Sequence, residues 1–248
     1  MKSRFFMLSL VAALGAATSR AAPPPKNITT IPEETVTAEP AGGTDLQKAR
    51  ARAKSTNNLK QIVLVLHNYA SANNSFPSDT YDKTGKAVLS WRVQLLPYME
   101  QDKLYREFKL DEPWDGKNNR ALLEKMPAIF ESPRVKVKTK GYTVYQEFRG
   151  KGAPFGANRK VWFTNITDGT SNTLFAVEAT SAVPWTKPAG VPYDEKKDLP
   201  DFGKAFDNKP LGAMFDGSVR VLDTKKISMV TLKAAVTPNG GEILGSDW

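Results

Sequence analysis

The sequence has no cysteine and only one histidine, His67, in its 248 residues. The lack of cysteine excludes disulfide bonds, thiol nucleophiles and cysteine-ligated metal sites. One histidine does not build a typical zinc site, and no spacing of serine, aspartate and histidine indicates a catalytic triad. We therefore predict a disulfide-free protein that is not an enzyme and holds no metal or cofactor. We expect His67 to hydrogen-bond a neighbour beside the apolar face of a helix.

Long apolar runs are also missing. A membrane-spanning helix needs roughly 20 apolar residues, whereas the run over residues 5–17 has thirteen. Lys2 and Arg4 precede this run, and small residues after it fit cleavage after Ala21. We interpret residues 1–21 as a cleaved signal peptide, with a buried N-terminal helix as the alternative. The interpretation predicts an extracytoplasmic protein, periplasmic or secreted, without a stable membrane span.

Acidic residues are fewer than basic ones, and the formal net charge is +9. The basic side chains gather in two runs, Lys48, Arg50, Arg52, Lys54 and Lys60, and then Arg134, Lys136, Lys138 and Lys140. Either run could meet nucleic acid or an anionic envelope polymer. The alternative is a solvated helix face and a strand edge that lysines protect from aggregation. We favour the alternative and expect no nucleic acid as a partner, because export argues against a genomic role.

The first part of the mature chain changes character at Thr44. Residues 22–43 are rich in proline and end in two glycines, which predicts a flexible linker. Thr44 and Gln47 fit a capping box, so we expect a helix from here to about residue 72, within one domain over residues 44–248. Its first half is charged and alanine-rich and should be exposed. Its apolar residues share one helical face: Leu59, Ile62, Val63, Leu66 and Ala70.

The rest of the chain first favours helices and then strands. A second helical region is expected over residues 90–108, in which Pro97 either kinks the helix or starts a new turn. Asn118 or Asn119 should cap a short helix ending near Lys125. Strand-like runs follow over residues 141–148, 161–166, 173–179, 211–215 and 219–222, and a short helix is expected over 229–236. Asp216-Gly217 is a strong hairpin signal. This order predicts an α+β fold, with a long N-terminal amphipathic helix packed on an antiparallel sheet.

Aromatic and acidic residues in the loops are the candidates for a binding site. Trp114, Trp185 and Tyr193 could form a surface for a ligand or partner, although packing of their loops onto the sheet is the alternative that we favour. Asp168, Thr170 and Asn172 alternate as in a calcium loop. The alternative is an Asp-Gly tight turn without a metal, which we favour while leaving cation binding open.

A series of short motifs runs through residues 45–248. The motifs are Asn57-Asn58-Leu59-Lys60, His67-Asn68-Tyr69, Ser90-Trp91-Arg92, Pro113-Trp114-Asp115-Gly116, Asp168-Gly169-Thr170-Ser171-Asn172, Glu178, Trp185-Thr186-Lys187-Pro188, Asp216-Gly217-Ser218 and Asn239-Gly240-Gly241-Glu242. In this order they resemble the bacterial family of unknown function DUF1559. The signature residues are Asn57, Asn58, His67, Asn68, Trp91, Asp168, Gly169, Ser171, Asn172, Glu178, Asp216 and Gly217.

The resemblance implies a fold and a compartment. The family is similar to type IV pilins and pseudopilins, with a long N-terminal helix on an antiparallel sheet, and is also labelled solute-binding-like. Its activity is unknown, so it supplies no catalytic residues. Members often carry an apolar helix before the first motif, where this chain has a proline-rich linker. Members also often have cysteines where this chain has Ser55 and Ser132, which implies that these two serines lie close together.

These observations lead to one favoured function and two alternatives. We predict an exported, non-enzymatic, pilin-like structural or interaction protein of the cell envelope, whose partner is an unknown envelope protein or glycan. The first alternative is an extracytoplasmic binding protein for a small solute or glycan. The second is a hydrolase that uses Asp168 or Glu178, for which a perturbed carboxylate in a cleft beside a second acid or base would be the sign. The released domain should be a soluble relative of pilins.

Overall fold

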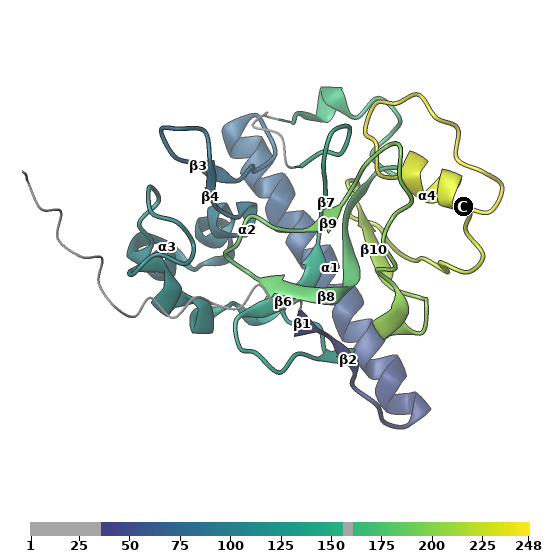
Figure 1. Cartoon of the computed structure of the whole chain (residues 1–248), viewed down its shortest axis with the longest axis horizontal. Coiled ribbons are helices and arrows are strands. Elements are labelled where there is room, and N and C mark those ends of the chain that lie inside the picture. The colour runs from purple at the N-terminus through teal and green to yellow at the C-terminus, as the bar shows by residue number, and fades with distance from the viewer. Residues whose placement is uncertain (1–35, 156–160) are drawn as a thin grey trace, which may run out of the picture. The chain divides into compact units, whose positions relative to one another are not determined.

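The computed structural model describes residues 36–155 and 161–248, and all statements below concern these ranges. The predicted signal peptide, residues 1–21, lies outside the described residues. The described chain mixes helices with a central antiparallel sheet (Figure 1), so the predicted α+β class is confirmed. Within the described ranges no helix combines the length and apolar character needed to cross a bilayer.

The longest helix, α1, covers Asp45–Asn73. Its capping box forms as predicted, because the Thr44 N–H donates to Gln47 Oε1 over 2.8 Å and the Gln47 N–H donates to Thr44 Oγ1 over 3.3 Å. The helix ends where Asn74 adopts the left-handed conformation. The apolar face is buried as the spacing predicted: Leu59, Ile62, Val63, Leu66 and Ala70. The first turns are exposed, as their composition indicated.

The central sheet is built around one long strand, β8. Its five strands are β1 (Val36–Thr37), β6 (Tyr142–Gln146), β8 (Leu174–Pro184), β10 (Leu211–Met214) and β11 (Val219–Val221). Val177 of β8 pairs with Gly212 of β10 and with Gln146 of β6, so β8 lies inside the sheet. β10 and β11 form the hairpin that Asp216-Gly217 predicted.

Both faces of β8 are covered, which explains why its sequence is almost continuously apolar. Val177 belongs to a buried cluster with Phe148 and with Leu232 of α4 (Met229–Ala234). The next side chain, Glu178, points the other way and accepts a hydrogen bond from Ser55 of α1. The sheet is therefore an inner layer between α1 and the α4 cluster.

Short elements connect these layers. Three two-stranded ribbons pair β2 (Glu39–Pro40) with β5 (Val135–Lys136), β3 (Thr80–Tyr81) with β4 (Ala87–Leu89), and β7 (Phe148–Arg149) with β9 (Val191–Pro192). The remaining α-helices are α2 (Trp91–Gln94) and α3 (Asp102–Glu107). The 3₁₀ helices are η1 (Leu96–Met99), η2 (Asn119–Lys125), η3 (Ala128–Phe130), η4 (Phe163–Asn165) and η5 (Lys204–Phe206).

The helical region over residues 90–108 is interrupted at Pro97, as that proline indicated, because Leu96–Met99 form the 3₁₀ helix η1 and Glu100 adopts a positive φ of 58°. Three other local predictions need correction. The predicted flexible linker over residues 22–43 is too long, because Val36–Thr37 and Glu39–Pro40 form β1 and β2, which pair with β8 and β5. Residues 163–165 form η4 and not a strand. Neither asparagine caps η2 through its side chain. The Asn119 side chain is buried. Its Oδ1 accepts from the Lys109 N–H over 2.9 Å and its Nδ2 donates to the Lys109 carbonyl over 2.8 Å, so it fixes the preceding loop.

Candidate functional site

Two groups of charged side chains lie in the interior, and the first surrounds Glu147. We call Asp79, Arg92, Glu147 and Arg149 the Glu147 network. Arg92 Nη2 lies 2.9 Å from Glu147 Oε2, and both side chains are 0% exposed. The Arg149 guanidinium contacts both Glu147 and Asp79. Two guanidiniums therefore face two carboxylates, which is the pairing that a buried ion cluster requires.

Backbone groups complete the Glu147 network. Arg92 also donates to the Tyr145 carbonyl over 2.7 Å, and the Trp91 N–H donates to Asp79 Oδ1 over 3.1 Å. Burial by itself would raise the pKa of Glu147, but the charges of Arg92 and Arg149 outweigh it and the pKa is lowered. Glu147 is thus held as an anion, and the network joins Arg92 of α2 and Asp79 before β3 to the chain that follows β6.

The second group surrounds Glu178 on β8. We call Ser55, Ser132, Arg134 and Glu178 the Glu178 network. Ser55 Oγ and Ser132 Oγ both donate to Glu178 Oε1, over 2.6 and 3.1 Å. Arg134 Nη1 forms an ion pair with Oε2, and the Leu211 N–H donates to the same oxygen over 2.9 Å. Each carboxylate oxygen therefore has two donors. The two serines share one acceptor atom, so they are neighbours in space, as the family resemblance implied.

Glu178 differs from Glu147 in the direction of its pKa. Burial raises the pKa of Glu178, although Arg134 and the two serines pull it down. Tyr145 adds a further hydroxyl, whose oxygen lies 2.7 Å from Ser55 Oγ. Burial also raises the pKa of Tyr145, so it is a neutral donor to Ser55. A perturbed carboxylate is present here, but its oxygens are already occupied by donors from the protein itself.

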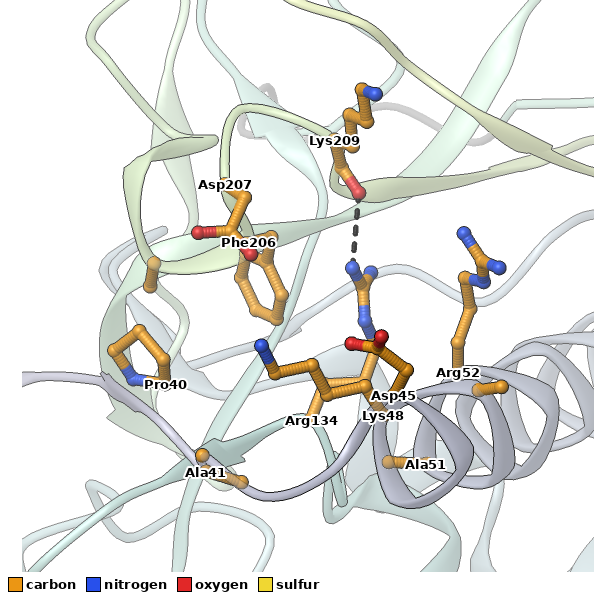
Figure 2. A pocket seen from close by; sticks show the side chains of 13 residues that line it. Pro40, Ala41, Asp45, Lys48, Ala51, Arg52, Arg134, Phe206, Asp207 and Lys209 are labelled. Carbon is orange, nitrogen blue, oxygen red and sulfur yellow. Dashed lines mark hydrogen bonds between the residues drawn. The ribbon is translucent and has the colours of Figure 1, made fainter.

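Arg134 connects the Glu178 network to a surface pocket of about 390 Å³, which we call the basic pocket. Figure 2 shows this pocket between the first turns of α1, the chain at Pro40 and Ala41, and the loop around Phe206. Its lining residues are Pro40, Ala41, Gly42, Asp45, Lys48, Ala49, Ala51, Arg52, Arg134, Ala205, Phe206, Asp207 and Lys209. Arg134 Nη2 donates to the Lys209 carbonyl over 3.1 Å, as the dashed line shows.

The basic pocket brings the two basic runs of the sequence together. Lys48 and Arg52 come from the first run, and Arg134 comes from the second. The Arg134 guanidinium lies over the Phe206 ring, 5.0 Å from its centre. The sequence alone did not predict that the two basic runs lie side by side in the fold. Nothing in the spacing of either run indicates that α1 and the segment before β5 are adjacent, and the only signal was the similar charge of the two runs.

The three aromatic residues proposed as a binding surface do not form a shared surface. Trp185 is 0% exposed, stacks on Phe130 and donates from Nε1 to the Leu123 carbonyl over 3.1 Å. Tyr193 is buried in the cluster that also contains Val177 and Leu232. Trp114 is half-buried with Lys187 over its ring at 5.4 Å. The packing role that we favoured describes Trp185 and Tyr193, because a large apolar ring gains most from leaving water.

The signature motifs hold distant loops together. The Asp168 carboxylate accepts from the backbone N–H groups of Gly240 and Gly241, over 2.8 and 3.1 Å, so the fifth and last motifs meet. Gly169 has a positive φ of 99°, as a tight turn requires. The Asn172 side chain donates back to the Asp168 carbonyl over 3.0 Å. Within the described ranges no cluster of three or more acidic or histidine side chains could hold a metal ion.

Other signature residues fix α1 against the rest of the fold. His67 Nε2 donates to the Phe215 carbonyl over 2.6 Å, which confirms the predicted hydrogen bond. Asn58 donates to the Glu131 carbonyl over 2.9 Å. Asn57 and Asn68 are exposed. Trp91 is buried against Phe175, with ring centres 5.0 Å apart. The remaining turn residues, Ser171, Asp216 and Gly217, lie at the sheet edge, where the Asp216 N–H donates to the Thr170 carbonyl over 3.1 Å.

The fold and the pocket define an α+β protein with a helix on an antiparallel sheet and a basic surface pocket. Residues 47–202 match the SBP_bac_10 family, described as "Protein of unknown function (DUF1559)". The match covers more than half of the chain, so the chain belongs to this family, which confirms what the motifs indicated. No curated protein and no solved structure matches the chain.

Proposed function

We propose that this protein is an exported, non-enzymatic interaction protein of the cell envelope with a pilin-like arrangement. The observation that carries the proposal is the basic pocket, where three segments far apart in sequence converge on the exposed first half of α1. A surface that combines free basic side chains with a hollow is suited to an acidic envelope component. The helix on one face of the sheet supports the pilin-like comparison.

The buried carboxylates support a structural role for the acidic residues. Glu147 and Glu178 each bind guanidinium and further donors, and no substrate is needed to satisfy them. The proline-rich residues 22–43 stand where pilins continue their apolar helix. The signal-peptide pattern of residues 1–21 supports a location outside the cytoplasm, periplasmic or secreted, and the proline-rich stretch in place of an apolar helix supports a soluble relative of pilins.

Capture from fractionated cells tests the envelope role. The purified protein, immobilised, is expected to retain an envelope protein or glycan at low salt and to release it at high salt, because screening weakens exposed charge contacts. Retention of nothing from the envelope fraction would contradict the proposal. Export is tested separately by the intact mass of the protein from the extracytoplasmic fraction, which should lack residues 1–21.

A second candidate function is extracytoplasmic binding of a small solute or glycan. The pocket volume of about 390 Å³ favours it, since ligand pockets commonly start at about 300 Å³. Calorimetry against a panel of metabolites and glycans distinguishes the two functions. Saturable binding of a small compound favours this second function, and capture of an envelope macromolecule alone favours the first.

A further inference from the structure

We infer that the basic pocket binds a sugar that carries a phosphate or carboxylate group, through Lys48 and Arg52. The inference rests on the proposed binding role and names the chemical class that the pocket would take. Lys48 and Arg52 lie four residues apart, so both project from one side of α1. In Figure 2 the Lys48 ammonium reaches toward Pro40 and Phe206, and the Arg52 guanidinium reaches toward the Lys209 segment.

Both basic groups keep their donors available. Among the described residues neither Lys48 nor Arg52 forms an ion pair, and no hydrogen bond from either side chain is present. Their neighbour on α1, Arg50, is exposed and strengthens the positive field around the pocket. The two head groups reach toward different parts of the pocket in Figure 2, so Lys48 can bind the acid group of a ligand while Arg52 donates to a hydroxyl elsewhere on it.

Arg134 forms a wall of the pocket that is already in position. Its guanidinium binds Glu178 on one side and the Lys209 carbonyl on the other, and it lies over the Phe206 ring. A group held in this way loses little freedom when a ligand arrives, which favours binding. Arg134 shares its charge with Glu178, so Lys48 and Arg52 supply the charge that is free for a ligand.

Two carboxylates in the same pocket argue for a ligand with hydroxyl groups. Asp45 and Asp207 line the pocket and would repel a bare, highly charged anion. Both can accept hydrogen bonds from sugar hydroxyls. Small and apolar residues, among them Ala49, Ala51 and Pro40, leave room for the carbon face of a ring. A sugar with one anionic group matches this combination better than inorganic phosphate does.

Calorimetry with defined probes tests the inference. Glucose 6-phosphate and galacturonate are expected to bind saturably, glucose should show no measurable binding, and inorganic phosphate should bind more weakly than glucose 6-phosphate. The double variant Lys48→Glu with Arg52→Glu should lower the affinity at least ~10-fold, since a charge-assisted contact is lost at each position. Comparison of galacturonate with polygalacturonate distinguishes a free sugar from the same group on a polymer.

The matched control changes the same charge on the same helix away from the pocket. Lys54 and Lys60 are exposed residues of α1 outside the lining, so Lys54→Glu with Lys60→Glu should change the affinity less than ~3-fold, through the screened general field. Both double variants should keep the Tm of the parent protein, because all four side chains are exposed. Equal loss in the two double variants, or no binding of either charged sugar, overturns the inference.

The outcomes separate this inference from the envelope role. If neither charged sugar binds the parent protein while an envelope component is still captured, the envelope role stands and the pocket assignment is overturned. If charged sugars bind in the pocket while no envelope component is captured, the pocket assignment stands and the envelope role is overturned.

Discussion

The Glu147 network and the Glu178 network use the same buried guanidinium–carboxylate pairing, yet their central carboxylates shift in opposite directions. Glu147 faces two guanidiniums, which outweigh burial and lower its pKa. Glu178 faces one guanidinium, and its other partners are neutral hydroxyls and an N–H group, so burial prevails and its pKa is raised. The number of nearby cations thus decides the charge preference of two equally buried glutamates.

The two networks also differ in what lies outside them. The Glu147 network joins α2 and the chain before β3 to the chain that follows β6 in the interior. In the Glu178 network, Arg134 reaches from the core to the basic pocket. Arg134 therefore belongs both to the buried pairing around Glu178 and to the wall of a surface pocket, and substitutions in the two networks compare these settings.

The largest expected effect comes from Arg92→Met. Removing this guanidinium leaves Glu147 as a buried charge with one partner fewer, and we expect a loss of about 3–5 kcal/mol in the free energy of unfolding. Denaturant unfolding at pH 7 measures it. The double variant with Glu147→Gln should lose less, because the uncompensated charge is gone. Equal losses in the single and double variants would mean that packing, and not charge, explains the effect.

Arg134→Met should cost about 3 kcal/mol at pH 7, the lower end of the range for a broken buried pair, since the Arg134 side chain is 13% exposed. The loss should depend on pH. Glu178 already has a raised pKa, and removing Arg134 raises it further. A raised carboxyl pKa makes stability fall as pH rises above the ordinary value of 4.5, so the loss should appear above pH 4.5 and shrink toward it.

The dependence of stability on pH also distinguishes the two networks. The pKa of Glu147 lies below its ordinary value of 4.5, so Arg92→Met should already be destabilised at pH 4.5. Arg134→Met should lie close to the parent protein at that pH. Unfolding curves for the three proteins between pH 4 and pH 8 measure the two windows. The same pH profile for both variants would contradict the opposite pKa shifts of Glu147 and Glu178.

Ser55→Ala should have a smaller effect, about 1–3 kcal/mol. It removes one of the two donors to Glu178 Oε1 and the acceptor of the Tyr145 hydroxyl. Thermal or denaturant unfolding measures the loss. Ser71→Ala on the exposed side of the same helix is the control and should stay within about 0.5 kcal/mol of the parent. An unchanged free energy of unfolding for Ser55→Ala would mean that water or Ser132 replaces the lost donor.

The smallest net change in stability is expected for Ser55→Cys combined with Ser132→Cys. Both serines contact one carboxylate oxygen, so the two cysteine side chains should be neighbours and we expect a disulfide to form between them. The bond should offset the loss of two hydroxyl donors to Glu178. Intact mass after oxidation should be two hydrogens lower than after reduction. Two free thiols after complete oxidation would show that the side chains are too far apart.

The elements that were predicted well depend on residues close in sequence. The capping box of Thr44 and Gln47, the apolar face of α1 and the Asp216-Gly217 hairpin all form as their local patterns indicated. Pro97 indicated the interruption of the helical region over residues 90–108, and the packing role favoured for Trp185 agrees with its burial. The 3₁₀ turn at residues 163–165 was missed, because packing overrode the local preference there.

The sequence by itself determined the α+β class, the bounds of α1, the family and the hydrogen-bonding role of His67, since each depends on short-range patterns or on ordered motifs. Only the tertiary structure decided where the buried charges find partners and where the two basic runs meet. Glu178 lies more than forty residues from its arginine, and Arg134 lies about eighty residues from the lysine and arginine of α1 that share its pocket. Pairing across such distances follows from how α1 packs on the sheet, which no local spacing specifies.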